Sequence, residues 1–208
     1  MPDPATLIAF VVASTILIVV PGPTVALVVA RSLSEGRRAA LPLAAGVALG
    51  DLVATSLSLA GVGALLAASA TAFTAVKWLG ALYLVWIAIR LWREPVTVPG
   101  EVAVDVAGSG RRAFRDGFLV TVFNPKGIVF FIAFVPQFLD PARPYLPQAA
   151  VFVGLFTAIG AVNVVAYALG ADGLRRVVAR PGILRAMSRT GAALIGAAGI
   201  ATLLAKRA

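Results

Sequence analysis

The sequence contains neither cysteine nor histidine, and these two absences remove several kinds of chemistry. Without cysteine the chain forms no disulfide and has no thiolate, and without histidine it lacks the commonest metal ligand. Histidine is also the side chain that most readily exchanges protons near neutral pH. We therefore expect no metal or organic cofactor, and any proton-coupled step depends on another kind of side chain.

Charged side chains are also scarce. Only 13% of the 208 residues are charged and 60% are hydrophobic, whereas soluble domains carry about 25% charged and about 45–50% apolar residues. The mean hydropathy is +0.96. A chain of this length cannot bury so much apolar surface in one small core, so we expect a lipid bilayer to surround it.

The charges that remain are mostly positive, with a net charge of +9. In a soluble protein this balance would suggest a nucleic-acid partner. Here the basic residues stand between apolar runs and form no single polar face, so we expect no nucleic acid. The N-terminus lacks the basic region of a signal peptide, because Asp3 precedes the first apolar run and Arg31 follows it. We therefore expect the first segment to be retained.

Six segments are apolar enough to cross a bilayer as helices, which takes about 20 residues each. They comprise residues 5–30, 39–68, 72–91, 118–139, 148–169 and 190–205. The sequence therefore predicts an all-α integral membrane protein with six transmembrane helices.

Arginine alternates between the predicted loops, which are rich in it at the first, third and fifth positions and poor elsewhere. The arginines are Arg31, Arg37 and Arg38 in the first loop, Arg93, Arg111, Arg112 and Arg115 in the third, and Arg175, Arg176, Arg180, Arg185 and Arg189 in the fifth. Because cytoplasmic loops carry the excess of Lys and Arg, this pattern places these loops inside and both termini outside. If the first segment is re-entrant, the N-terminus lies inside instead.

The chain divides into two halves of three segments each, a first repeat at 1–92 and a second at 117–208, with a cytoplasmic linker loop at 93–116. The first helix of each half is interrupted, by Pro21-Gly22-Pro23 in one and by Asn124-Pro125-Lys126-Gly127 in the other. Because each half has three spans, the second half enters the membrane in the opposite orientation to the first. Matching breaks in such inverted repeats mark the substrate site of many transporters. One break alone would equally suit a kinked membrane helix.

A broken helix offers partners for both charges of an amino acid. Pro21 frees a backbone carbonyl one turn earlier, which can accept from an ammonium group. The half-helix that starts near Thr24 exposes N–H groups and the positive end of its dipole, which suits a carboxylate. An amino acid carries both groups on one carbon. We therefore expect Pro21, Gly22, Pro23 and Thr24 to line a substrate site.

Asp51 lies deep in the second apolar segment, roughly 18 Å from its start and so near the middle of the bilayer. A carboxylate at that depth costs roughly 2.5–3.5 kcal/mol to insert. It is therefore expected to partner a cation, carry a proton or bind the substrate. The alternative is a structural role, in which Asp51 accepts from the exposed N–H groups of a broken helix.

Three further polar residues are candidates for the site. Lys126 either pairs with Asp51 or with freed carbonyls, or extends toward the cytoplasmic surface. Asn124, which precedes Pro125, donates and accepts at once and so suits a backbone break or a zwitterion. Asn163 is the counterpart of Asp51 in the second half, and it serves either as a helix–helix hydrogen bond or as a site residue.

Several motifs run through most of the chain in an order that resembles the LysE-type amino-acid exporter family. They are Pro21-Gly22-Pro23, Gly36-Arg37-Arg38-Ala39, Gly46-x-x-x-Gly50-Asp51, Lys77-Trp78-Leu79-Gly80-Ala81-x-Tyr83-Leu84, Gly117-Phe118-Leu119, Asn124-Pro125-Lys126 and Phe134-x-Pro136-Gln137-Phe138. The sequence most resembles the threonine/homoserine efflux (RhtB) branch. It departs from that family at Thr24, where Asn or Asp is frequent, and at Thr121, where Asn is common.

The resemblance implies a secondary active exporter of amino acids or small derivatives in the bacterial inner membrane. It also implies an amino-acid substrate, protons as the coupling ion, and a route lined by Asp51 and the two breaks. The alternatives are a passive channel and an exporter of another small polar metabolite. A membrane enzyme would have only Asp51 and Lys126 as buried ionisable groups, and a scaffold would need neither. Helix faces with glycines such as Gly46 and Gly50 suit packing within one chain and between two, so the sequence allows a homodimer.

Overall fold

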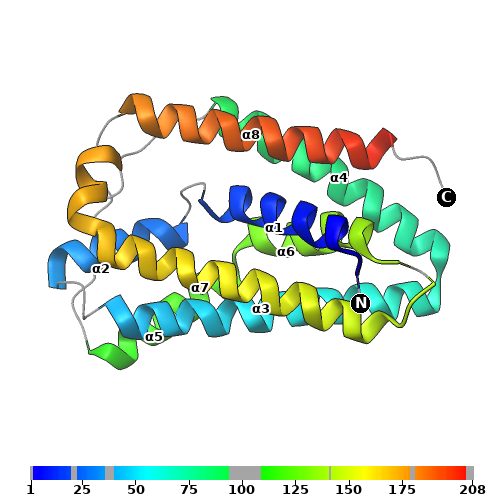
Figure 1. Ribbon diagram of the computed structural model, residues 1–208, viewed down its shortest axis with the longest axis horizontal. Coiled ribbons are helices and arrows are strands. Elements are labelled where there is room, and N and C mark those ends of the chain that lie inside the picture. Colours follow the sequence, from blue (N-terminus) through cyan, green and yellow to red (C-terminus); the bar gives the residue numbers. More distant parts are fainter. Residues whose placement is uncertain are drawn as a thin grey trace.

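The computed structural model describes residues 2–19, 23–35, 40–93, 109–140, 142–178 and 181–204, and within these ranges every regular element is a helix (Figure 1). The elements are α1 (Pro4–Val19), α2 (Pro23–Glu35), α3 (Ala40–Ala68), α4 (Ala70–Arg93), α5 (Gly110–Val122), α6 (Pro125–Val129), the π-helix η2 (Phe130–Phe134), the 3-10 helix η3 (Val135–Phe138), α7 (Tyr145–Val178) and α8 (Pro181–Leu204). The predicted all-α class is confirmed.

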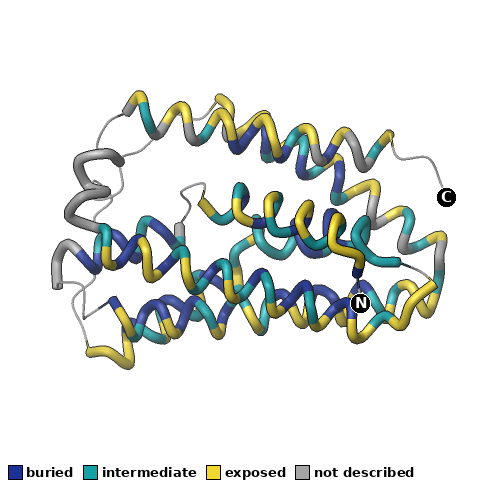
Figure 2. The backbone as a smooth tube through the Cα atoms, viewed as in Figure 1, coloured by how far each residue is buried: buried dark blue, intermediate teal, exposed yellow. Residues whose placement is uncertain are grey.

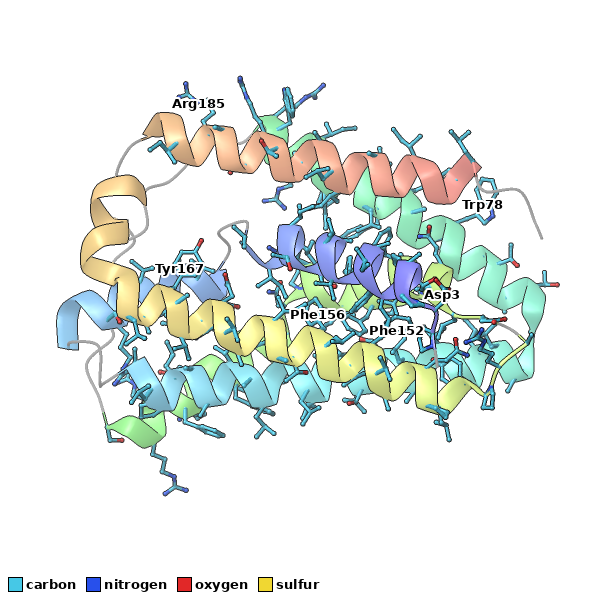
Figure 3. All side chains as sticks on the ribbon, viewed as in Figure 1. Asp3, Trp78, Phe152, Phe156, Tyr167 and Arg185 are labelled. Atoms are coloured by element: carbon cyan, nitrogen blue, oxygen red, sulfur yellow. The ribbon has the colours of Figure 1, made fainter. Side chains whose placement is uncertain are left out.

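The long helices lie side by side along the long axis of the molecule (Figure 1). The end of α2, the start of α5 and the end of α7 lie at one end, where Arg185 is also found (Figure 3). The N-terminus and the turn between α3 and α4 lie at the opposite end. Residues 36–39, 94–108 and 179–180, which carry several of the arginines of the predicted loops, lie outside the described residues.

Two helices of the described chain are long and apolar enough to cross a membrane by themselves, α3 and the Tyr145–Gly170 part of α7. Two bent pairs raise that number to as many as four if each pair is one span. One pair joins α1 to α2 at an angle of 57°, and the other joins α5 to the Pro125–Phe138 helices at 41°. In α4 a shorter apolar stretch covers Trp78–Arg90.

Helix α5 begins earlier than the sequence predicts. The predicted third loop reaches Asp116, whereas the helix begins at Gly110. The hydroxyl of Ser109 caps the helix by accepting from the backbone N–H of Arg112 at 3.4 Å. A side-chain ion pair between Arg112 and Asp116, 3.8 Å apart, then spans one turn of the helix. These local interactions extend α5 beyond the apolar segment that the sequence marks.

The assignment of Arg31 to the first loop is wrong. Arg31 lies on α2, and only 2% of its surface is exposed. No helix-breaking residue follows it until Gly36, so the helix continues through the polar end of the segment. The next residue, Ser32, donates from its hydroxyl to the carbonyl of Ala168 on α7 at 2.9 Å, which joins this end of α2 to the bundle.

Buried apolar residues form two separate clusters, seen as dark stretches in Figure 2. The phenylalanine cluster is built around Phe10, Phe130, Phe131, Phe134, Phe152 and Phe156. The valine cluster contains Val25, Val28, Val29, Leu43, Val47, Val164 and Tyr167. Helix α7 contributes to both, with Phe152 and Phe156 toward the N-terminal end of the molecule and Tyr167 toward the other (Figure 3).

Glycines allow α3 and α5 to approach closely, as the spacing of Gly46 and Gly50 predicts. A Cβ atom on Gly46 would collide with the backbone carbonyl of Phe114. A Cβ atom on Gly50 would lie only 2.8 Å from the Cβ of Thr121. This contact places Thr121 next to the helix turn that carries Asp51.

Candidate functional site

The first predicted break lies where the sequence places it. Helix α1 ends at Val19 and α2 begins at Pro23, of which the backbone alone is described. Pro21 and Gly22, two of the predicted site residues, lie outside the described residues. Because the last carbonyls of a helix have no partner within it, the end of α1 presents acceptors in the middle of the bundle.

Three side chains donate hydrogen bonds to these carbonyls. The ammonium of Lys126 donates to the carbonyl of Leu17 at 2.8 Å. The amide of Asn163 donates to Ile18 over a long 3.5 Å, and the hydroxyl of Tyr167 donates to Val19 at 3.1 Å. The freed carbonyls therefore do accept from an ammonium group, as the sequence predicts, and the chain itself supplies one.

Tyr167 is a residue of this site that the sequence did not predict. It lies one helical turn after Asn163 on α7, and residues four apart share one face of a helix. Figure 3 shows its ring directed from α7 toward the end of α1. The signal available in the sequence was therefore a second polar group on the same face of an apolar segment.

The second break also lies at the predicted position. Helix α5 ends at Val122 and α6 begins at Pro125, whose fixed φ suits the first position of a helix. The side-chain oxygen of Asn124 accepts from the backbone N–H of Lys126 at 3.1 Å. Asn124 is thus the N-cap of α6, and Pro125 is exposed at its start. The capping role accounts for the asparagine before the proline.

A cavity of about 60 Å³ lies where the two breaks meet α3 and α7. It is lined by Leu17, Ile18, Thr24, Val25, Val47, Asp51, Ala54, Thr55, Thr121, Asn124, Lys126, Gly127, Phe156, Gly160, Asn163 and Val164. Five predicted site residues therefore meet in one place, namely Thr24, Asp51, Asn124, Lys126 and Asn163. Both apolar clusters supply lining residues, so the cavity lies between them.

Asp51 projects from α3 toward α7. A Cβ atom on Gly160 would lie 2.5 Å from Oδ2 of Asp51, so the carboxylate occupies the space that a larger residue on α7 would fill. The charges of Asp51 and Lys126 are close enough to attract each other. Gly160 was not identified from the sequence, because a glycine in an apolar segment carries no chemistry of its own.

Two threonine hydroxyls complete the polar lining. Oγ1 of Thr24 and Oγ1 of Thr121 are buried, and neither has a hydrogen-bond partner among the described residues. The cavity is thus lined by one carboxylate, one ammonium, the amides of Asn124 and Asn163, and the hydroxyls of Thr24, Thr55 and Thr121. Within the described residues no group of three His, Cys, Asp or Glu side chains could hold a metal ion.

A cavity that contains charged and polar side chains at the meeting point of two broken helices, inside an apolar helical bundle, is typical of secondary transporters. The profile of the LysE type translocator family matches residues 15–206. The chain therefore belongs to the LysE type translocator family, as its motifs predict. It is a multi-pass membrane protein of a bacterial family of transporters, and it is not an enzyme.

Relatives with curated descriptions include membrane proteins and efflux proteins. The chain is 33% identical over 182 residues to an uncharacterized membrane protein of Vibrio cholerae, covering 88% of each. It is 30% identical over 181 residues to the homoserine/homoserine lactone efflux protein of Salmonella typhimurium, covering 87% of each. It is 29% identical over 136 residues to the leucine efflux protein of the same organism, covering 65% of this chain and 64% of that protein. No solved structure matches the chain.

Proposed function

We propose that this protein is a secondary active exporter of amino acids or small amino-acid derivatives, driven by the proton gradient. The observation that carries the proposal is the presence of Asp51 and Lys126 in one cavity at the ends of two broken helices. The descriptions of the homoserine and leucine efflux proteins support the same class of cargo. Asp51 is the proposed proton carrier.

The charges of the cavity favour a cargo without net charge. One carboxylate and one ammonium face the cavity, and their charges cancel. A zwitterion with an uncharged side chain would pair its ammonium with Asp51 and its carboxylate with Lys126, leaving no excess charge in a low-dielectric site. The hydroxyls of Thr24 and Thr121 are available to a polar group of the cargo.

The cavity has to widen during the transport cycle. Its volume of about 60 Å³ has room for a few water molecules. Sites that hold small molecules usually begin near 300 Å³. Alternating access in transporters moves one group of helices against another around a fixed central site. The proposed cycle therefore opens the cavity first on the cytoplasmic side and then on the outer side.

The proposed architecture has six spans in two inverted repeats, residues 1–92 and 117–208, joined by the linker at 93–116. The spans are α1 with α2, α3, α4, α5 through η3, α7 and α8. Helices α4 and α8 have 24 residues each, which is about 36 Å at 1.5 Å per residue and so enough to cross a bilayer. In this arrangement Asp51 and Asn163 occupy corresponding helices of the two repeats.

Counterflow in proteoliposomes tests the proposed function. Vesicles containing the purified protein are preloaded with unlabelled L-leucine, L-homoserine or L-threonine, and uptake of the same labelled amino acid is followed. An exporter accelerates this exchange above the rate seen with unloaded vesicles, and an imposed pH gradient drives net efflux. A passive channel would show no acceleration by preloading. Absence of exchange for all three amino acids and for other small zwitterions would contradict the proposal.

A further inference from the structure

The ammonium of Lys126 is held at a position where it faces two different partners. It donates to the carbonyl of Leu17 at 2.8 Å, and its charge interacts with that of Asp51. Leu17 is close to the end of α1, whose freed carbonyls form the negative end of the helix dipole. Lys126 therefore bridges the two breaks, because it is carried by α6 and bound to α1.

Lys126 is the second residue of α6, a helix of only five residues. An asparagine cap and a proline already start this helix, so the lysine is not required for α6 to form. Its ammonium instead provides a positive charge in the lining of the cavity.

Space beside Lys126 allows its side chain to change partner. Gly127, the next residue, also lines the cavity, and a Cβ atom there would meet nothing within 4 Å. A lysine side chain is flexible along its four carbons. A rotation about these bonds would turn the ammonium from Leu17 toward the cavity that Lys126 lines.

We propose that Lys126 recognises the carboxylate of the cargo, and that the carbonyl of Leu17 holds its ammonium when no carboxylate is bound. This inference rests on the proposed function as an amino-acid exporter. Asp51, which lines the same cavity from α3, then recognises the ammonium of the cargo. The pair makes the protein selective for molecules that carry both groups and no net charge.

Substitution of Lys126 and substitution of Asp51 should change the preferred cargo in opposite ways. In Lys126→Met the cavity keeps one negative charge, which suits a cargo with an ammonium and no carboxylate. In Asp51→Asn it keeps one positive charge, which suits a cargo with a carboxylate and no ammonium. A variant damaged only in its folding would lose all cargoes alike.

The experiment measures equilibrium binding of three probes to the purified full-length protein in detergent. The first probe is whichever of L-leucine, L-homoserine and L-threonine the unaltered protein exchanges fastest by counterflow. The others are its amide, which lacks the carboxylate, and its N-acetyl derivative, which lacks the ammonium. Lys126→Arg keeps the charge, and Lys77→Met removes a lysine from α4, a helix from which no described residue lines the cavity. Thermal unfolding of each variant checks that it is folded.

We expect Lys126→Met to lose affinity for the amino acid and its N-acetyl derivative by about tenfold or more, because charge-assisted hydrogen bonds are the strong ones. The same variant should bind the amide at least as well as the unaltered protein does. Asp51→Asn should show the opposite selectivity, and Lys126→Arg and Lys77→Met should keep the preference for the amino acid. Equal loss of all three probes in Lys126→Met, or no change in its selectivity, would overturn the inference. Failure of the unaltered protein to exchange any amino acid would instead contradict the proposed function.

Discussion

The carboxylate of Asp51 on α3 lies against Gly160 on α7, at a point where a Cβ atom on the glycine would be 2.5 Å from Oδ2. The two residues are far apart in the sequence, and both line the same cavity. Gly160 thus provides the space in which the charge of Asp51 can face the cavity.

Gly160→Ala should impair transport by displacing the carboxylate of Asp51. Overpacking of this kind costs about 1–3 kcal/mol, and we expect counterflow to fall by about tenfold. Gly154→Ala is the matched control, since Gly154 is an exposed glycine of the same helix whose Cβ atom would meet nothing within 4 Å. The measurement compares the counterflow rates of the two variants in proteoliposomes with equal protein content. Equal rates in both would show that the contact with Asp51 is unimportant for transport.

Asp51→Asn should abolish efflux driven by a pH gradient while leaving membrane insertion intact. Asparagine has the shape of aspartate but neither binds nor releases a proton near neutral pH, so the proposed coupling step is lost. The measurement is efflux of labelled amino acid from proteoliposomes with and without an imposed pH gradient. Asp116→Asn, in the middle of α5 and outside the cavity lining, is the control and should keep the response. Undiminished pH-driven efflux in Asp51→Asn would remove Asp51 from the coupling role.

Tyr167→Phe should weaken the end of α1 and slow exchange severalfold. The change deletes the hydrogen bond to the carbonyl of Val19, and a bond of this type contributes about 0.5–1.5 kcal/mol to the free energy of unfolding. Tyr145→Phe removes a similar bond, to the carbonyl of Leu59 at 2.5 Å, but away from the cavity. Both variants should unfold at a lower temperature, and only Tyr167→Phe should exchange more slowly. If both variants slow exchange equally, the effect belongs to general stability.

The proposed topology can be tested with single cysteines, because the natural chain contains none. Arg111→Cys lies at the start of α5 and Thr71→Cys near the start of α4, and both positions are exposed. We expect a membrane-impermeant thiol reagent to label Thr71→Cys in intact cells, and to label Arg111→Cys only after the inner face is made accessible. The reverse pattern would contradict the orientation inferred from the arginines.

The features that could be predicted from the sequence are those with a local cause. Proline is disfavoured inside a helix and asparagine is a good helix cap, so Pro21-Gly22-Pro23 and Asn124-Pro125 indicate both breaks. The position of Asp51 in the interior of a long helix follows from its place in an apolar run. These signals need no knowledge of which helices are neighbours.

The features that escaped prediction depend on packing between distant segments. The donation from Lys126 to Leu17 joins residues 109 positions apart. The role of Gly160 exists only because α7 passes beside Asp51. The charge of Arg31 suggests a loop, and its burial depends on packing against other helices, which the sequence does not show.

The two apolar clusters lie on either side of the cavity and share one helix, α7. Helix α7 supplies Phe152 and Phe156 to one cluster and Val164 and Tyr167 to the other. A stiff helix that swings away from one cluster is pressed against the other at its opposite end. We therefore expect the phenylalanine cluster and the valine cluster to open in turn, because a movement of α7 that loosens one cluster tightens the other.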